Sequence, residues 1–191
     1  MISYLKPALI LLTLLTLLTG VAYPLLVTGL AQLIFPEQAN GSLLKDDSGK
    51  VIGSKMIGQT FSNPAYFWGR PSATAPYPYN AGASGGSNLG PTNPALLDAV
   101  KTRIAALHAA DPENKAPIPV DLITASASGL DPHISPAAAE YQVDRIARLK
   151  HIAPEKLREW VELHTEERQW EFLGEKRVNV LSLNMALTAI H

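Results

Sequence analysis

The sequence predicts an α+β protein made of one N-terminal transmembrane helix and a single extracytoplasmic α+β domain. The first observation is an uncharged apolar run from Pro7 to Phe35. The second is helical spacing of apolar residues, which dominates the C-terminal half of the chain. The third is a pair of short apolar segments, residues 51–61 and 120–127, whose β-branched residues favour strands. Together they predict helices with a minor sheet component after the span.

The apolar run is longer than the roughly 20 residues that cross a bilayer core. A lone span must be helical, because lipid cannot satisfy backbone N–H and C=O groups. Pro7 suits a first helical turn, and Pro36 ends the run. Pro24 lies inside it and lacks an N–H, so we expect a kink there.

A cleaved signal peptide is the alternative interpretation. Lys6 would form its charged region, Leu9 to Leu18 its apolar region, and Gly20 to Ala22 the cleavage site. The apolar sequence nevertheless continues from Leu25 to Phe35, which a signal peptide does not need. This continuation favours a retained anchor.

The charges flanking the run predict its orientation. Lys6 precedes the span, whereas Glu37 follows it. The positive-inside bias therefore places residues 1–6 in the cytoplasm, residues 7–35 in the membrane and residues 36–191 outside the cytoplasm.

Small and hydroxyl side chains gather on one face of the predicted span. Such residues allow close helix–helix approach in lipid, so we interpret the face as a partner contact. The alternative is that each threonine hydroxyl bonds the carbonyl four residues earlier in its own helix. The face consists of Thr13, Thr16, Gly20 and Tyr23, with Thr28 further along.

The first segments after the span contain turns and one long loop. Turn signals occur at Asn40–Ser42, which also matches the glycosylation sequon, and at Asp46–Gly49. Residues 63–94 combine several prolines and glycines with five aromatic residues. Disordered linkers are poor in aromatics, so this pattern predicts an ordered loop, either functional or a surface loop fixed by its own aromatics.

Three helices have clear start signals. Asn93-Pro94 and Ser135-Pro136 each combine an N-cap residue with a proline in the first turn, and Pro154 begins a third helix. We expect these helices to end near residues 110, 151 and 164. A strand at residues 120–127, a short strand at 178–181 and a terminal helix at 183–190 complete the prediction. The side chains expected to face the core include Leu97, Val100, Ile104, Leu107, Val143, Ile146, Leu149, Leu157, Trp160 and Val161, and Trp170, Phe172 and Leu173 add apolar bulk.

Composition narrows the functional classes. The net charge is −1, with no basic excess, which argues against a nucleic-acid partner. The chain contains no cysteine, so disulfides, thiolate metal sites and cysteine nucleophiles are excluded. The five histidines are scattered without the spacing of a metal-binding pair. We therefore expect no metal site in this chain.

Two stretches were considered as sites for chemistry. The glycine-rich loop Gly82–Ser87 lacks the lysine of a phosphate-binding loop, although its backbone could bind an anion in a tethered ligand-binding module. Ser128, Asp131 and His133 are the residue types of a hydrolase, but no nucleophile elbow surrounds them. The alternative is that they satisfy loop backbone and helix caps. We predict no catalytic and no cofactor-binding residues.

Several motifs appear in one order over nearly the whole chain. They are Tyr23–Leu26, Gln38–Leu43, Ile57–Gln59, Phe67–Ala73, Tyr79-Asn80, Ala83–Leu89, Asn93-Pro94, Thr124–Asp131, Ile134–Pro136, Val178–Val180 and Leu183–Leu187. As a set they resemble the C subunit of the Kdp potassium-transporting P-type ATPase of bacteria.

The resemblance implies a non-catalytic subunit of a high-affinity potassium uptake complex in the bacterial inner membrane. Its implied partners are a channel-like K⁺-conducting subunit, an ATP-hydrolysing P-type subunit and a very small membrane subunit. The implied role is assembly of the pump, with one membrane helix and a periplasmic domain beside the channel-like subunit.

The resemblance also implies a chaperone role that raises the ATP affinity of the catalytic subunit. A domain outside the membrane cannot contact cytoplasmic ATP, so we expect ATP only on the partner. In addition, the stretch Ile152–Lys156 has Lys156 where the family motif has glutamine. This departure argues against direct nucleotide contact there.

We therefore expect two partner-facing surfaces. The first is the threonine and glycine face of the span. The second comprises the two loops 67–73 and 83–89, in which Arg70 would form charge-assisted hydrogen bonds to a partner or to its own loop. The candidate interface residues are Thr13, Thr16, Gly20, Tyr23, Phe67, Arg70, Ser84, Gly85, Gly86 and Asn88.

Overall fold

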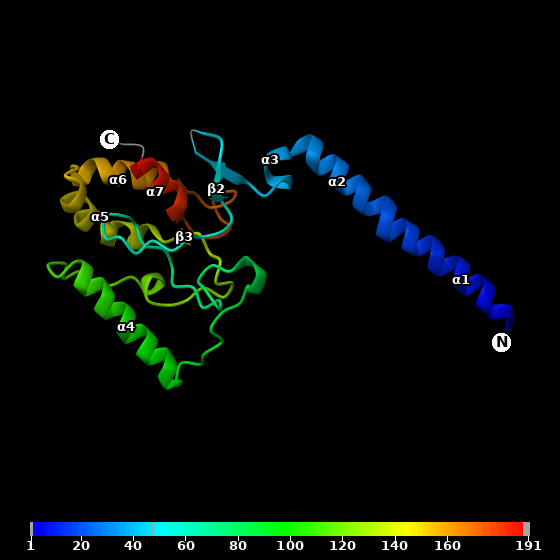
Figure 1. Cartoon of the computed structure of the whole chain (residues 1–191), viewed down its shortest axis with the longest axis horizontal. Coiled ribbons are helices and arrows are strands. Elements are labelled where there is room, and N and C mark those ends of the chain that lie inside the picture. The colour runs from blue at the N-terminus through cyan, green and yellow to red at the C-terminus, as the bar shows by residue number, and fades with distance from the viewer. Residues whose placement is uncertain (1, 47, 189–191) are drawn as a thin grey trace. The chain divides into compact units, whose positions relative to one another are not determined.

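The computed structural model describes residues 2–46 and 48–188 and divides the chain into two compact units, residues 1–54 and 55–191. Figure 1 shows a helical N-terminal unit and a mixed helix-and-strand unit after it. The predicted α+β class with one long apolar N-terminal helix is confirmed. The two units are described separately below.

The first unit begins with a helical rod built from α1 (Ile2–Leu17), a π-helical segment (Leu18–Ala22) and α2 (Tyr23–Ile34) (Figure 1). The Tyr23 N–H donates to the carbonyl of Leu18, five residues earlier. Pro24, the next residue, has no N–H and cannot donate the hydrogen bond that an α-helix makes to the carbonyl four residues earlier. The wider π turn before it accommodates the missing hydrogen bond. A π turn thus lies directly before Pro24, where the sequence predicts a kink.

A short helix and a hairpin complete this unit. Helix α3 (Pro36–Ala39) leads to β1 (Leu43–Lys45), which pairs antiparallel with β2 (Val51–Ser54). Both predicted turns are present, since Gly41 and Gly49 have positive φ values of 88° and 82°. The predicted strand over residues 51–61 is confirmed only as far as Ser54. Asp47, within the second predicted turn, lies outside the described residues.

The described part of the second unit, residues 55–188, contains four α-helices: α4 (Pro94–Ala110), α5 (Pro136–Lys150), α6 (Pro154–Leu163) and α7 (Val180–Thr188). The caps form as predicted, because Asn93 and Ser135 accept hydrogen bonds from the N–H groups of Ala95 and Ala138. Two 3₁₀ turns, Ala81–Ala83 and Val120–Leu122, lie in the loops. An antiparallel sheet of order β3-β5-β4 joins His133–Ile134, Arg177–Asn179 and Thr165–Glu166.

Several predictions for this unit are wrong. Residues 120–127 form a 3₁₀ turn and bends, because the carbonyl of Val120 accepts hydrogen bonds from the backbone and hydroxyl of Thr124. Among the residues that the structure describes, no strand pairs with the segment. Leu97 and Leu149 are about half exposed. Helix α7 begins at Val180, three residues before the predicted start, and Ile190 lies outside the described residues. The side chains of Trp170 and Phe172 are 79% and 70% exposed and lie outside the core.

The core of the second unit surrounds the aromatic segment 66–68. Phe67 is fully buried among apolar side chains of α5, α6 and α7. Its backbone N–H donates to Asn184, and its carbonyl accepts from the same side-chain amide. Gln142 makes the equivalent pair of bonds to Trp68. Buried backbone groups need partners, and two amide side chains here supply what a neighbouring strand would otherwise provide.

Candidate functional site

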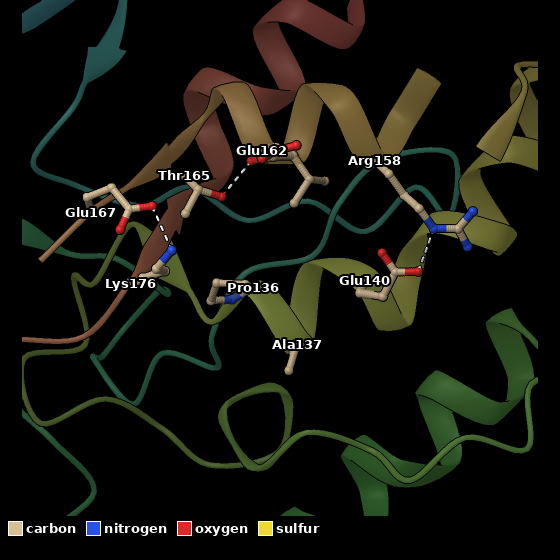
Figure 2. Close-up of a pocket in the computed structure, with 9 residues that line it drawn as sticks. Pro136, Ala137, Glu140, Arg158, Glu162, Thr165, Glu167 and Lys176 are labelled. Carbon is tan, nitrogen blue, oxygen red and sulfur yellow. Dashed lines mark hydrogen bonds and ion pairs between the residues drawn. The ribbon is translucent and has the colours of Figure 1, made fainter. Parts of the chain in front are cut away.

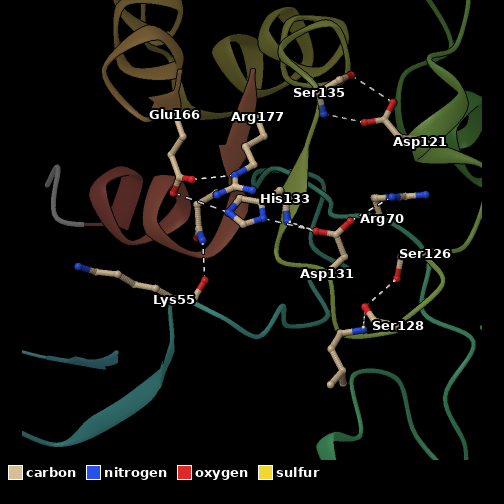
Figure 3. Close-up of polar contacts among 12 residues, drawn as sticks. Lys55, Arg70, Asp121, Ser126, Ser128, Asp131, His133, Ser135, Glu166 and Arg177 are labelled. Carbon is tan, nitrogen blue, oxygen red and sulfur yellow. Dashed lines mark hydrogen bonds and ion pairs between the residues drawn. The ribbon is translucent and has the colours of Figure 1, made fainter. Parts of the chain in front are cut away.

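Four loop segments that are far apart in the sequence pack together in the second unit. They are residues 69–74, 79–80, 84–86 and 126–131, which we call the loop cluster. Arg70 donates from Nη1 to Asp131 Oδ2 at 3.0 Å and from Nη2 to the Ala125 carbonyl at 3.5 Å. Figure 3 shows Arg70 beside Asp131, next to the serines of the last segment. The cluster therefore joins stretches 61 residues apart along the chain.

Hydrogen bonds hold the cluster at several further points. Ser72 Oγ donates to the Gly129 carbonyl at 2.7 Å and accepts from the Tyr79 N–H. Tyr79 Oη donates to the Arg70 carbonyl at 2.6 Å. The Gly85 N–H and the Ser84 hydroxyl both donate to the Ser128 carbonyl. Loops that lack a strand ladder thus satisfy their backbone through one another.

Glycines allow the segments to approach this closely. A Cβ atom at Gly58 would lie 2.4 Å from the Tyr79 ring and 2.8 Å from the Asp131 carbonyl oxygen. At Gly129, whose φ is +67°, it would lie 2.5 Å from a methyl carbon of Thr74. Larger residues at these positions cannot fit without movement of the backbone.

Charge stabilises the centre of the cluster. Burial disfavours the charged form of Asp131, but hydrogen bonds from His133 and the guanidinium of Arg70 outweigh it and hold the pKa of this carboxyl below its usual value. Burial, and then the negative charge of Asp131, raise the pKa of Tyr79 to about 12. Asp131 is therefore an anion and Tyr79 a neutral donor at physiological pH.

His133 extends the cluster toward the sheet. Its Nδ1 lies 3.5 Å from Asp131 Oδ1, and its Nε2 lies 3.7 Å from Glu166 Oε1 on β4 (Figure 3). Glu166 also accepts from Arg177 Nε at 2.8 Å. The histidine thus lies between two carboxylates from separate segments.

The geometry does not assemble the hydrolase set. Ser126 Oγ accepts from the Gly129 N–H, Ser128 Oγ accepts from the Leu130 N–H, and Asp131 accepts from the His133 N–H. Within residues 2–46 and 48–188, no hydrogen bond joins His133 to either serine. The prediction that these side chains satisfy loop backbone is confirmed.

The predicted interface residues fall into two groups. Those of the span, Thr13, Thr16, Gly20 and Tyr23, are all exposed in the isolated chain. Thr13 Oγ1 donates to the Leu9 carbonyl, as the alternative for the threonines predicts. In the second unit, Ser84 and Asn88 are exposed and Gly85 and Gly86 are half-buried. Asn88 adopts a positive φ of 52°.

Phe67, predicted as an interface residue, is instead a core residue, because its side chain is fully buried. Arg70 bonds within its own domain, which is one of the two outcomes expected for it. Sequence reasoning missed the supporting roles of Gln142, Arg145 and Asn184. The signal was present as polar residues on apolar helix faces, but nothing in the sequence identified segment 66–68 as their partner.

Arg145 illustrates this support. Its Nη2 donates to the Tyr66 carbonyl at 2.8 Å, and its guanidinium lies 4.7 Å from the centre of the Trp68 ring. Burial lowers the pKa of Arg145 to about 10, so it remains charged at neutral pH. It fixes the aromatic segment from which the loop cluster begins.

An open groove of about 430 Å³ lies between α5, α6 and β4, with Glu167 and Lys176 also in its lining (Figure 2). Its charged side chains are largely paired, with Arg158 to Glu140 at 2.7 Å and Lys176 to Glu167 at 2.8 Å. In the part of the chain that the structure describes, no cluster of three or more His, Asp or Glu could hold a metal ion.

The fold and the site define a class of protein, one with a single candidate membrane-spanning helix and an α+β domain. Hydrogen bonds among its loops hold one surface of this domain. Residues 4–34 form this candidate span, and none of its most apolar window is buried. A family model described as "K+-transporting ATPase, c chain" matches residues 5–189.

Curated relatives match over the same length. The Potassium-transporting ATPase KdpC subunit of Methylococcus capsulatus is 64% identical over 190 residues and 100% of both chains. The KdpC subunits of Polaromonas naphthalenivorans and Dechloromonas aromatica are 65% and 62% identical, each over 98% of this chain and 95% and 98% of their own. The chain belongs to the KdpC family, so the resemblance noted in the sequence is confirmed.

Proposed function

We propose that this chain is a non-catalytic subunit that assembles and stabilises an ATP-driven potassium uptake pump of the bacterial inner membrane. Its partners are a channel-like K⁺-conducting subunit, a P-type subunit that hydrolyses ATP, and a small membrane subunit. Family membership supports an accessory place in the K⁺-transporting ATPase. The observation that carries the docking proposal is the loop cluster, whose donors and acceptors bond one another and so present one fixed surface.

The orientation belongs to the same proposal. The N-terminus lies in the cytoplasm, and the domain after the span lies outside, where it meets the outer surface of the channel-like subunit. Lys6 before the span and Glu37 after it support this orientation. On this placement the chain binds no ATP itself. An increase in ATP affinity of the catalytic subunit would have to pass through packing among the spans.

The span supplies the second contact. A Cβ atom at Gly20 would meet only a methyl carbon of Thr16, at 4.0 Å, and one at Gly29 would meet nothing within 4 Å. A larger residue at either position therefore leaves the isolated chain undisturbed. Any effect of such a residue on the complex must come from contacts that the chain makes with its partners.

This difference provides the test. The complex is purified from native membranes that express Gly20→Leu or the matched control Gly29→Leu, and the yields of partner subunits are compared. We expect Gly20→Leu to reduce recovery of the complex at least several-fold, because close helix packing is lost. Gly29 lies on a different side of the rod, so Gly29→Leu should have less effect. Equal recovery from both variants would contradict the proposed face.

A tethered hydrolase is the alternative that purification also decides. Recovery of the chain as a monomer with esterase or peptidase turnover would contradict the proposal that it is an accessory subunit. We expect instead that His133→Ala leaves K⁺-dependent ATP hydrolysis of the complex within a few-fold, since no hydrogen bond links His133 to a serine in the described residues.

A further inference from the structure

A small cavity beside the loop cluster contains two arginines. Its volume is about 240 Å³, and its lining includes Thr60, Phe61, Arg70, Pro78, Tyr79 and Arg103. Arg103 comes from α4 and Arg70 from the loop cluster, so the cavity lies where the helix faces the loops. All of these residues belong to the second unit.

The charge of Arg103 is not compensated. Its Nη1 donates to the Ile123 carbonyl at 2.7 Å, and within residues 2–46 and 48–188 no carboxylate forms an ion pair with it. Burial lowers the pKa of Arg103. A partly buried cation without a counter-ion is costly, and an anion placed beside it recovers that cost.

Arg70 adds a second incomplete donor set. Asp131 neutralises its charge through Nη1, but its Nε–H is buried without a hydrogen-bond partner in the described part of the chain. No carboxylate lines the cavity, whereas Phe61 and Pro78 provide apolar wall. Guanidinium groups bind the paired oxygens of carboxylates and phosphates best where water is partly excluded.

We propose that this cavity binds a small soluble oxyanion, a carboxylate or phosphate group, with Arg103 as its main charge partner. The volume lies below the roughly 300–1,000 Å³ of sites for drug-sized ligands, which suits a small oxyanion. The site does not depend on the proposed accessory role, because one domain of this chain provides all of its residues.

Isothermal titration of the purified full-length chain in detergent, at constant ionic strength, tests the site. The probes are inorganic phosphate and acetate, titrated separately to distinguish the two oxyanion classes. We expect saturable binding of at least one probe, weakened at least tenfold in Arg103→Gln. Lys101→Gln is the matched control, because Lys101 is an exposed cation on the same helix and pairs with Asp98. It should bind as the unmodified chain does.

A second variant keeps the test decisive if Arg103→Gln fails to fold. Thr60 is exposed and lines the cavity, so Thr60→Glu places a carboxylate beside the arginines without removing a core contact. We expect it to abolish binding of either probe. Absence of saturable binding in the unmodified chain, or equal binding in Thr60→Glu, would overturn the proposal.

Discussion

The span and the loop cluster differ in whether their side chains have contact partners within the chain. The small-residue face of the span, including Thr13, Thr16 and Gly20, is exposed. In the loop cluster, by contrast, most polar groups form hydrogen bonds with one another, such as Arg70 with Asp131 and Ser72 with Gly129. On the proposed function, helices of a partner complete the span face. The loop cluster needs no partner to hold its conformation, and it offers a preformed shape.

This difference predicts where substitutions act. Changes in the loop cluster should lower the stability of the free chain, whereas changes on the span face should leave the free chain intact and affect the complex. On the docking proposal, the loop cluster avoids an ordering cost, since its internal hydrogen bonds already hold its conformation.

The largest effect is expected at Gly58. A Cβ atom there overlaps the Tyr79 ring and the Asp131 carbonyl, so Gly58→Ala should destabilise the domain by about 3 kcal/mol. Urea unfolding of the purified chain, followed by tryptophan fluorescence, measures this. Gly90→Ala is the control, because a Cβ atom there meets nothing within 4 Å. Similar midpoints for the two variants would show that the close approach at Gly58 is not required.

Asn184 should come next. Its side chain bonds both backbone groups of Phe67, and Asn184→Leu would leave a buried N–H and C=O without partners. We expect a loss of about 2 kcal/mol. The same unfolding assay measures it, with Ser182→Ala as the control on the same helix. An unchanged midpoint in Asn184→Leu would mean that segment 66–68 does not depend on this amide.

The pH dependence of the Arg70–Asp131 pair should be smaller. Against the effect of burial, hydrogen bonds from His133 and then Arg70 hold the folded pKa of Asp131 below its unfolded value, so these contacts stabilise the domain above about pH 4. That stabilisation is lost as pH falls through the folded pKa. We expect Asp131→Asn to cost about 1–2 kcal/mol at pH 7 and less at pH values below the folded pKa of Asp131, because the protonated carboxyl resembles the amide. A constant cost over this range would contradict a charged role for Asp131.

Much of the fold could be predicted because its signals are local. Asn93-Pro94 and Ser135-Pro136 mark helix starts through capping chemistry that acts over three residues. The uncharged run predicts the long N-terminal helix, and Pro24 predicts a disturbance there, although not that a π turn would absorb it. Turns containing Gly41 and Gly49 follow from the conformational freedom of glycine.

The loop cluster could not be predicted, because its pairings are long-range. The bond from Arg70 to Asp131 spans 61 residues, and the bond from Asn184 to Phe67 spans 117. Hydrophobic periodicity carries no information about such partners. For the same reason, sequence patterns alone place Phe67 at an interface, although its ring is buried in the core. The apolar sequence at 120–127 resembles a strand, but no strand in the described part of the chain pairs with it.

The central claim is that the loop cluster docks on a partner of the potassium pump. The chain contains no cysteine, so Ser84→Cys introduces a single thiol on an exposed part of the cluster. The rate of its modification by a water-soluble maleimide is measured in the free chain and in the purified complex, with the exposed Glu159→Cys on α6 as the control. We expect at least fivefold slower labelling of Ser84→Cys in the complex and little change for Glu159→Cys. Equal rates for Ser84→Cys in the free chain and in the complex would contradict docking through the loop cluster.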